Sequence, residues 1–489
     1  MKSKKKKKIN LIVKSISQGI NFVAIVVLFV LLYLIKKSNM MPTKYMTLII
    51  LATVIPLALY TLMCYIKNPK KGILIVMDLI AIPAIFVEFY GITKINETIN
   101  WLKGNFTLGY NTDSYYVIVN KNSSYDKIED IKGKTVYYYD DFVDYDKLNN
   151  ALNENVKAEL KKAESNDELI TTIKADKKYI VLMHASFYDS LTENDPDFKD
   201  KTKIISSDVM IKEKIKKKEK ELPDVLKEPF VIYLSGIDTR NGDMPARGLS
   251  DVNMVIVVNP LTHKVLMVNI PRDYYVQLHG TTGLKDKLTH AGVNGGVDLS
   301  IATIQDILGV EIDYYLRVNF NAVVNLVDAI GGLTINSDVN YSFTCWTDSG
   351  CVIHPGDNNV GGRCALAFAR ERHAYETGDR HRGENQQQVI SLIMDKVGSS
   401  KELLNNYSNI LKALDGTFET TFSDDKVSDL IRHQLDKMPH WEVITSNLDG
   451  SGAMEYTYSY PNQKLSVMIP DQSTIETAKQ KINEILNEK

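Results

Sequence analysis

The residues best suited to chemistry in this chain are its arginines, because they are few and clustered. Lysine and arginine together number 58, of which only ten are arginine. None occurs before Arg240, and five lie between Arg363 and Arg382. Where a lysine would serve, this chain uses one. The retained arginines therefore indicate positions that need a planar, bidentate and permanently charged group. Phosphate is the commonest partner of such a group.

The spacing within the cluster favours one shared anion site. An extended backbone at residues 369–372 would point Arg370 and Arg372 to one face. Arg382 and Gln386 are four residues apart at the head of a predicted helix, so they share a face. The free N–H groups at that helix start also suit an anion. The alternative is a solvated surface of ion pairs with the neighbouring acids Glu371, Asp379 and Glu384.

Two acidic residues lie at predicted strand ends in front of this cluster. Asp238 ends the first strand of the domain, and Asp251 immediately precedes the second. In open α/β sheets, ligands collect at strand ends. Two carboxylates beside a pyrophosphate would hold Mg²⁺ or Mn²⁺, because such ions take one or two protein carboxylates plus phosphate oxygens. The alternative for each residue alone is a turn or capping role.

The N-terminal fifth of the chain predicts a membrane anchor. Three apolar runs, at 17–35, 45–66 and 73–92, each approach the 20 residues that cross a bilayer as a helix. Asp78 and Glu88 interrupt the third run, and a buried soluble hairpin is the alternative. A cleaved signal peptide would show one such run followed by a cleavage site.

The lysines predict the orientation of these helices. Lys4–Lys8 and the loop with Lys67, Lys70 and Lys71 fall on one side. The positive-inside rule then places the N-terminus in the cytoplasm. Three crossings leave the chain after about residue 93 outside the cell, in a multi-pass membrane protein with its catalytic part extracellular.

Beyond the membrane runs, the pattern predicts an α/β fold with a mixed sheet covered by helices. We expect strands at 115–119, 135–139 and 179–183 and a helix at 146–163 in a small accessory domain, followed by a charged run at 212–220. Further strands are expected at 230–237, 254–259 and 265–270. The expected helices are 297–308, 320–330, 384–397, 425–438 and 474–486. The predicted divisions are 1–93 (membrane), 94–222 (accessory domain and linker), 223–400 (catalytic domain) and 401–489 (a C-terminal helical extension).

Four cysteines are present, and one of them, Cys64, lies in a membrane run. Cys345 and Cys351 flank a Gly/Asp/Ser loop that could bring them to bridging distance. We expect these two to form a disulfide outside the cell. Cys364, in an apolar run, is expected to be a free and buried thiol. No CxxC pair supports a zinc site.

At this point seven blocks, in order, resemble the LytR–CpsA–Psr family. The match covers roughly residues 230–400, and so many blocks in order make it specific. The blocks are GID at 236–238, SDVNM at 250–254, IPRDYYV at 270–276, KLTHA at 287–291, VDAIGG at 327–332, FARER at 368–372, and 378–387. Three membrane helices followed by an accessory domain resemble the capsule-attachment subgroup of that family.

The resemblance implies roles for particular residues. It makes Asp238 and Asp251 the metal and acid–base carboxylates. Arg272 would be both catalytic and a pyrophosphate ligand, and the remaining head-group ligands would be Lys287, Arg370, Arg372, Arg382 and Gln386. Two positions depart from the family pattern. Leu249 stands where an arginine often precedes the Ser-Asp pair, with Arg247 a possible substitute, and Glu384 stands where a basic residue is common.

The family resemblance also implies the reaction. It predicts a Mg²⁺-dependent phosphotransferase that moves a glycopolymer, here capsular polysaccharide, from a polyprenyl-pyrophosphate carrier to peptidoglycan. Membrane proteins of capsule synthesis are further expected partners. The rival interpretations are a regulator that binds the lipid carrier without chemistry, and a pyrophosphatase that uses water as acceptor. The predicted topology argues against nucleic-acid binding.

Overall fold

The computed structural model describes residues 2–67, 69–106, 110–214, 222–238, 244–398 and 409–489. They form two compact units. One unit holds Met1–Thr107 with Phe422–Pro439, and the other holds Leu108–Thr421 with His440–Lys489.

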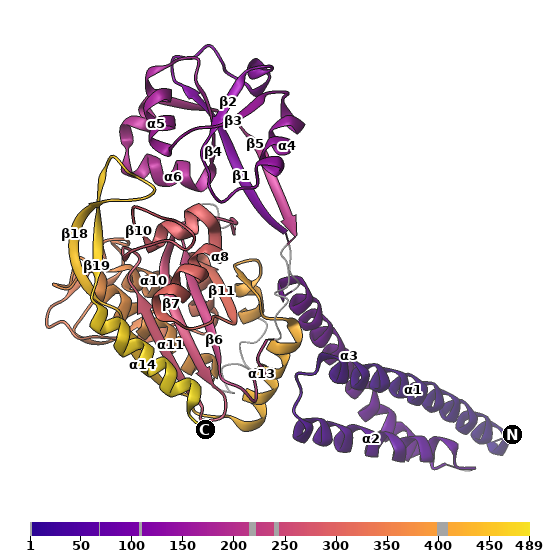
Figure 1. The fold of residues 1–489 in the computed structure, drawn as a ribbon. Helices are drawn as coiled ribbons and strands as arrows, with labels where there is room; N and C mark the ends of the chain where they lie inside the picture. The colour runs from indigo at the N-terminus through magenta and orange to yellow at the C-terminus, as the bar shows by residue number, and fades with distance from the viewer. Residues whose placement is uncertain (1, 68, 107–109, 215–221, 239–243, 399–408) are drawn as a thin grey trace. The chain divides into compact units, whose positions relative to one another are not determined.

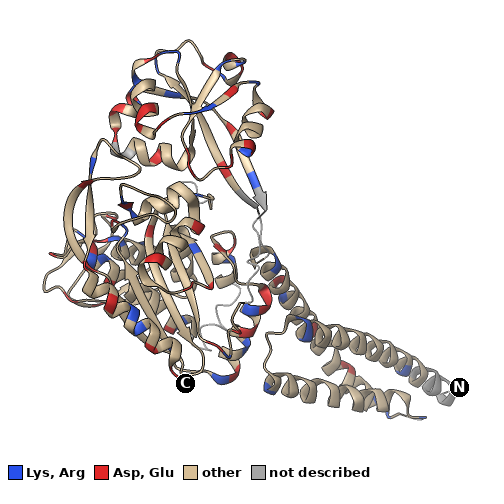
Figure 2. Cartoon of the chain, viewed as in Figure 1, with Lys and Arg blue, Asp and Glu red and all other residues tan. Residues whose placement is uncertain are grey.

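The first unit contains the three predicted membrane helices. They are α1 (Lys2–Ser38), α2 (Thr43–Tyr65) and α3 (Lys71–Phe106), and each includes a window with a mean hydropathy of at least 2.2. Figure 2 shows how sparse charged residues are along them. The prediction of three membrane-length helices is therefore confirmed. The third helix continues past the expected boundary at residue 93, through a polar final segment.

The acidic interruption of the third helix has partners inside the bundle. Asp78 of α3 accepts hydrogen bonds from Ser17 of α1, at 2.8 Å, and from the Tyr60 hydroxyl of α2. A carboxyl group at membrane depth is costly unless it is paired with other polar groups. These two contacts explain how Asp78 fits within an otherwise apolar span.

A later helix, α13 (Asp424–Lys437), packs within the same unit. Arg432 donates to the Asn39 carbonyl at 3.3 Å, and Asn39 donates to Asp429 at 3.1 Å. Lys44 lies 3.5 Å from the Asp436 carboxylate. The turn between α1 and α2 is thus joined to a segment that follows the membrane helices in sequence.

The second unit begins with a five-stranded accessory sheet in the order β3-β2-β4-β1-β5. Its strands are β1 (Tyr110–Asn120), β2 (Thr135–Tyr138), β3 (Glu159–Lys162), β4 (Ile180–His184) and β5 (Thr202–Lys214). Its helices are α4 (Tyr145–Asn155), α5 (Asn166–Ala175), α6 (Ala185–Asn194) and α7 (Pro196–Lys201).

Two accessory predictions were wrong in detail. The expected helix at 146–163 ends at Asn155, and residues 159–162 form a strand parallel to β2. Leu160 is buried against the sheet there, and this long-range pairing outweighs local helix propensity. Residues 212–214 of the expected charged linker belong to β5, and residues 215–220 lie outside the described residues.

The central sheet of the unit has six strands in the order β16-β11-β6-β7-β8-β17. Their bounds are β6 (Phe230–Ile237), β7 (Ser250–Asn259), β8 (Lys264–Ile270), β11 (Tyr314–Asn319), β16 (Phe418–Thr420) and β17 (Glu442–Asn447). The sheet is mixed, because β11 and β17 run parallel to their neighbours β6 and β8 while β7 is antiparallel to both of its neighbours.

The C-terminal segment is more than the helical extension that we expected. It supplies β16 and β17 to the central sheet, and a hairpin of β18 (Gly450–Tyr456) and β19 (Lys464–Pro470). Parallel pairing of β17 with β8 is a contact between distant parts of the sequence, which local patterns do not report.

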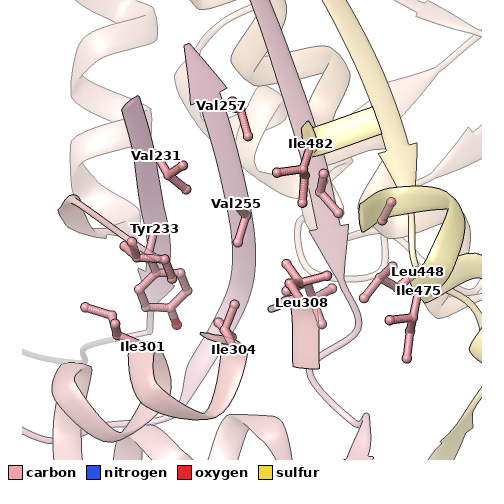
Figure 3. Close-up of a cluster of buried hydrophobic side chains, with 14 of the residues drawn as sticks. Val231, Tyr233, Val255, Val257, Ile301, Ile304, Leu308, Leu448, Ile475 and Ile482 are labelled. Carbon is pink, nitrogen blue, oxygen red and sulfur yellow. The ribbon is translucent and has the colours of Figure 1, made fainter. Parts of the chain in front are cut away.

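Helices cover both faces of the sheet (Figure 1). On one face, Tyr233 and Val255 pack against Ile301 and Ile304 of α8 (Leu288–Leu308) and against α14 (Gln472–Asn487), as Figure 3 shows. On the other, Leu234 and Met254 pack with α11 (Asp379–Gly398). Alternate residues of each strand enter opposite cores. The predicted α/β class is confirmed.

Short elements complete the domain at one end of the sheet. They are β9 (Tyr275–Val276), β10 (Asp286–Lys287), α9 (Phe320–Ala329), β12 (Leu333–Ser337), β13 (Phe343–Thr344), β14 (Val352–Ile353), β15 (Gly356–Val360) and α10 (Gly362–Arg370).

The predicted disulfide between Cys345 and Cys351 was wrong. The structure joins Cys351 to Cys364, with a Cα–Cα distance of 5.1 Å, and leaves Cys345 as a buried thiol. Cys345 and Cys351 do face each other across the hairpin base, where the Cys345 N–H donates to the Cys351 carbonyl at 2.9 Å. Packing of α10 against this hairpin brings in Cys364, which the loop spacing alone did not reveal.

Peptide mapping checks this arrangement directly. We expect non-reduced digests of the purified protein to contain one linked pair, Cys351 with Cys364, and an alkylatable Cys345 after unfolding. Mass spectrometry identifies the linked peptides. A Cys345–Cys351 link would contradict the structure and restore the assignment made from loop spacing.

Candidate active site

A bulge at one edge of the central sheet places the two acids. Ile237 pairs with Ser250 and Gly236 pairs with Val252, so Asp251 is an extra residue without a partner on β6. A β-bulge re-aims a side chain in this way and is common beside active sites. A Cβ atom on Gly236 would lie 2.8 Å from the Val252 side chain, so the pairing of the two strands at this position needs glycine. Asp238 follows Ile237 directly at the same edge.

The first arginine reaches the same edge from β8. Ile270, at the end of β8, pairs with Asn253 near the start of β7, so the residues that follow lie beside Asp251. Arg272 Nη1 lies 2.6 Å from Asp251 Oδ1. The Arg272 side chain is 27% exposed, so it remains reachable by a ligand. Burial alone would lower the pKa of Arg272, but Asp251 and Asp273 outweigh it and raise that pKa.

A lysine joins this cluster through an acid that sequence reasoning did not single out. Lys287 Nζ lies 2.7 Å from Asp273 Oδ1, and Arg272 Nε lies 3.7 Å from Asp273 Oδ2. Burial alone would raise the pKa of Asp273, but Lys287 and Arg272 hold it below its usual range. Asp273 therefore separates two cations. The sequence places it in the IPRDYYV block beside Arg272 but does not indicate its contact with Lys287.

Lys287 is held in place by a buried carboxylate beside it. Asp286 is fully buried and accepts hydrogen bonds from the Lys287 N–H at 2.8 Å and from Ser459 Oγ at 2.5 Å. The His290 ring lies 2.6 Å from the same carboxylate. Burial would raise the pKa of Asp286, but His290 and these hydrogen bonds hold it low. The KLTHA block is thus fixed at the start of α8.

Arg382 enters the cluster from the first turn of α11. It is buried and lies 2.7 Å from Asp379. Burial lowers the pKa of Arg382, and the nearby Arg272 lowers it further, against the opposing effect of the carboxylates. The helix comes close because residue 383 is glycine, where a Cβ atom would lie 2.1 Å from Asn269. An anion bound here would relieve the repulsion between Arg272 and Arg382.

The two arginines of the FARER block do not share the extended geometry that we expected. Arg370 is the last residue of α10, and Glu371, which follows it, is extended. Arg370 donates to Asp238 at 3.2 Å and lies over the Phe320 ring. Arg372 lies over the Trp346 ring instead, with 5.5 Å from Cζ to the ring centroid. The prediction of an extended backbone was wrong at Arg370, because helix α10 continues into the block, and the two arginines have different partners.

The remaining predicted residues lie on α11. Gln386 is buried one turn after Arg382, on the same side of the helix. Glu384 lies 3.8 Å from Arg380 and 3.4 Å from His381. Arg380 in turn donates to Asp449, which follows β17, at 2.8 Å. Glu384 therefore pairs with basic residues of its own helix.

Of the predicted ligands, the structure thus gathers Asp251, Arg272, Lys287 and Arg382 into one cluster. Asp238 and Arg370 form a separate ion pair at the same end of the sheet, where β6 ends and β7 begins. Arg240 lies outside the described residues.

Arg247 and Leu249, just before the Ser-Asp pair, both contact the accessory domain. Arg247 Nη1 lies 2.7 Å from Asp140, and its Nε lies 3.6 Å from Asp113. Ser186 of α6 donates to the Arg247 carbonyl at 2.5 Å. Leu249 packs against the accessory core. The structure therefore does not support Arg247 as a substitute ligand for pyrophosphate, because its side chain is 8% exposed and committed to two carboxylates.

This contact holds the segment that leads into Asp251, and its energy can be measured. Arg247→Ala should destabilise the protein by about 3–5 kcal/mol, because it removes the guanidinium that neutralises two largely buried carboxylates. Asp140→Asn should lower the free energy of unfolding by less in the Arg247→Ala variant than in the wild-type protein. Chemical denaturation of the purified protein in detergent gives the double-mutant cycle.

The matched control is the exposed pair of Lys162 and Asp141, also in the accessory domain. Lys162→Ala should change stability by less than about 1 kcal/mol. Additive effects of Arg247→Ala and Asp140→Asn would contradict the described contact.

Comparison with known proteins gives the family. The LytR_cpsA_psr family profile matches residues 199–484, more than half of the chain. The chain belongs to this family. The matched region begins in α7 of the accessory domain, includes β5, and extends through the C-terminal strands and most of α14. These elements belong to the same folded unit.

Several relatives are teichoic acid transferases by name. The chain is 35% identical over 233 residues to the polyisoprenyl-teichoic acid–peptidoglycan teichoic acid transferase TagU of Bacillus mycoides, covering 48% of this chain and 73% of TagU. It is 32% identical to TagU of Bacillus subtilis, covering 45% and 68%. Among solved structures, protein gbs0355 of Streptococcus agalactiae is 25% identical with a TM-score of 0.46, covering 54% of this chain and 89% of that protein.

Proposed function

We propose that this protein is a membrane-anchored phosphotransferase that moves a glycopolymer from a polyprenyl-pyrophosphate carrier to peptidoglycan. The observation that carries the proposal is the charge cluster at the sheet edge. Arg272, Lys287 and Arg382 converge there from separate elements, with Asp251 among them. Several cations around one carboxylate suit a pyrophosphate that must be both bound and cleaved.

Each residue has a distinct part in the proposed reaction. Arg272, Lys287 and Arg382 bind the pyrophosphate oxygens, and Arg370 adds a contact beside Asp238. An acceptor hydroxyl attacks the phosphorus next to the glycan, and Asp251 takes the hydroxyl proton. The bond from that phosphorus to the bridging oxygen breaks, and polyprenyl phosphate leaves. The arginines stabilise the charge that grows on this leaving group.

The acids also fit a divalent metal ion. No group of three or more His, Cys, Asp or Glu side chains with metal-site geometry occurs among the described residues. Two carboxylates at one sheet edge instead suit Mg²⁺ or Mn²⁺, which would draw its remaining ligands from phosphate oxygens and water. Asp238 and Asp251 would hold the ion. Such an ion would supply charge neutralisation to the phosphates.

Three observations support the donor and acceptor that we propose. The relatives' names specify a polyisoprenyl-linked polymer and peptidoglycan. The described cluster suits the pyrophosphate of such a carrier. The layout of three membrane helices, an accessory domain and then the family domain favours capsular polysaccharide as the polymer, with capsule-synthesis membrane proteins as further partners.

We also propose that the second folded unit lies outside the cell. The lysines at the N-terminus and in the α2–α3 loop favour the cytoplasm. The turn between α1 and α2, on the opposite side of the membrane by this count, contacts α13 through Asn39 and Lys44. Because α13 follows the third membrane helix and contacts this turn, α13 must lie on the same side of the membrane as the turn, which is the outer side.

Protease accessibility tests this topology. Protease added to intact, wall-stripped cells should digest the region from Phe230 to Lys489, because three crossings place it outside. An epitope at the N-terminus should stay protected until the membrane is opened, whereas an epitope at the C-terminus should be lost at once. Immunoblots for the two epitopes report the result, and protection of the C-terminal epitope would refute the orientation.

Substitutions at the cluster separate binding from chemistry. Arg272→Ala and Arg382→Ala should each weaken binding of polyprenyl pyrophosphate, because each charge-assisted contact contributes about 1.5–3 kcal/mol. Arg272→Lys should restore only part of the lost affinity for polyprenyl pyrophosphate, because lysine cannot form two parallel hydrogen bonds to a phosphate as arginine does. Asp251→Ala should keep lipid binding within a few-fold and abolish transfer. Lipid affinity and transfer rate are measured for every variant.

Arg432→Ala is the control, because Arg432 lies on α13 in the other folded unit. It should leave both lipid affinity and transfer rate unchanged. Full transfer by the Asp251→Ala variant would remove the enzymatic proposal and favour a lipid-binding regulator.

A further inference from the structure

An exposed tryptophan lies against the FARER block and has no part in the proposed reaction. Trp346 lies in the loop between β13 and β14, and it is 53% exposed. Most tryptophans are largely buried, so an exposed indole often marks a binding surface. Tyr341 and Val352, on the same hairpin, are also exposed.

Several contacts fix the loop that carries this indole. The Trp346 backbone N–H donates to the Glu371 carboxylate at 2.8 Å, and the same carboxylate accepts from the backbone N–H groups of Arg372 and His373. The Cys351–Cys364 disulfide ties the hairpin to α10. A side chain that is ordered before binding loses little conformational entropy when a ligand arrives.

The contacts of the ring connect it to the FARER block. Arg372 Cζ lies 5.5 Å from the ring centroid, and Trp346 Nε1 lies 3.4 Å from the Arg370 carbonyl oxygen. The His373 ring meets the indole edge-on at a centroid distance of 5.0 Å. The exposed aromatic surface is therefore continuous with Arg372 and with the backbone of Arg370, whose side chain pairs with Asp238.

We propose that Trp346 is a stacking platform for the pyranose ring attached directly to the pyrophosphate of the donor. This inference rests on the proposed function, because it assigns a sugar to the same site. The first sugar of the carrier-linked glycan is bonded to the phosphate that is attacked, so a subsite for it must adjoin the phosphate ligands. The C–H face of a pyranose suits the electron-rich face of an indole.

The neighbouring arginine adds to the case for a sugar at this position. Arg372 is held over the indole, so it presents N–H donors beside an apolar ring face. A pyranose offers C–H groups on one face and hydroxyl acceptors around its rim, which fits this pair of side chains. Arg372 would thus contact the donor through its sugar, or through the phosphate oxygen that joins it, while Arg272 and Arg382 bind the pyrophosphate.

Binding of two matched lipids to the full-length protein in detergent micelles tests the proposal. One probe is a short-chain polyprenyl pyrophosphate without sugar, and the other is the same lipid carrying a single N-acetylhexosamine on its pyrophosphate. Trp346→Ala should weaken binding of the sugar-bearing lipid by about threefold to tenfold and leave the sugar-free lipid unchanged. Trp346→Phe should retain most of the affinity.

The control is Tyr456→Ala, which removes a similarly exposed aromatic side chain on β18. It should change neither affinity. Equal weakening of both lipids by Trp346→Ala would show that the indole contacts lipid or pyrophosphate, and would overturn the sugar assignment. An effect only on the Michaelis constant for peptidoglycan would assign the platform to the acceptor and also overturn it.

These measurements separate this inference from the proposed function. If the wild-type protein binds neither lipid, the proposed function fails. If it binds both and Trp346→Ala binds both equally well, only the sugar platform fails.

Discussion

The architecture of the site depends on one electrostatic constraint. Arg272 lies close enough to the buried Arg382 to lower the pKa of Arg382. Unpaired, such charges would be costly. Asp251, Asp273 and Asp379 each lie within 4 Å of one of these arginines and reduce that cost. The carboxylates keep the cations in place, and a pyrophosphate could then take over part of their pairing.

The surrounding fold satisfies this constraint from several directions. The bulge at Asp251 turns its side chain toward Arg272, and Gly383 lets α11 approach the end of β8. Asp286 fixes Lys287 at the start of α8. The accessory domain contributes through Arg247, because its ion pair with Asp140 holds the segment before β7. This contact gives the accessory domain a structural role next to Asp251.

Local pattern and motif order predicted a large part of this arrangement. Apolar runs and turn positions predicted the membrane helices and the central strands β6, β7 and β8. They also predicted that Asp238 and Asp251 lie at strand ends. What failed depended on packing between distant segments. The Cys351–Cys364 disulfide requires α10 to lie against a hairpin, and β17 joins the sheet by parallel pairing with β8. The contacts of Asp273 with Lys287 and of Trp346 with Arg372 likewise appear only when separate elements meet.

The most direct test of the central claim is to identify the product. Full-length protein would be incubated with lipid-linked glycan, Mg²⁺ and purified peptidoglycan, and the products digested and analysed by mass spectrometry. A glycopolymer transferase should yield glycan joined to a peptidoglycan sugar through a phosphodiester, with release of polyprenyl phosphate, and Asp251→Ala should yield none. Free glycan phosphate, formed equally well without peptidoglycan, would show a pyrophosphatase and contradict the account.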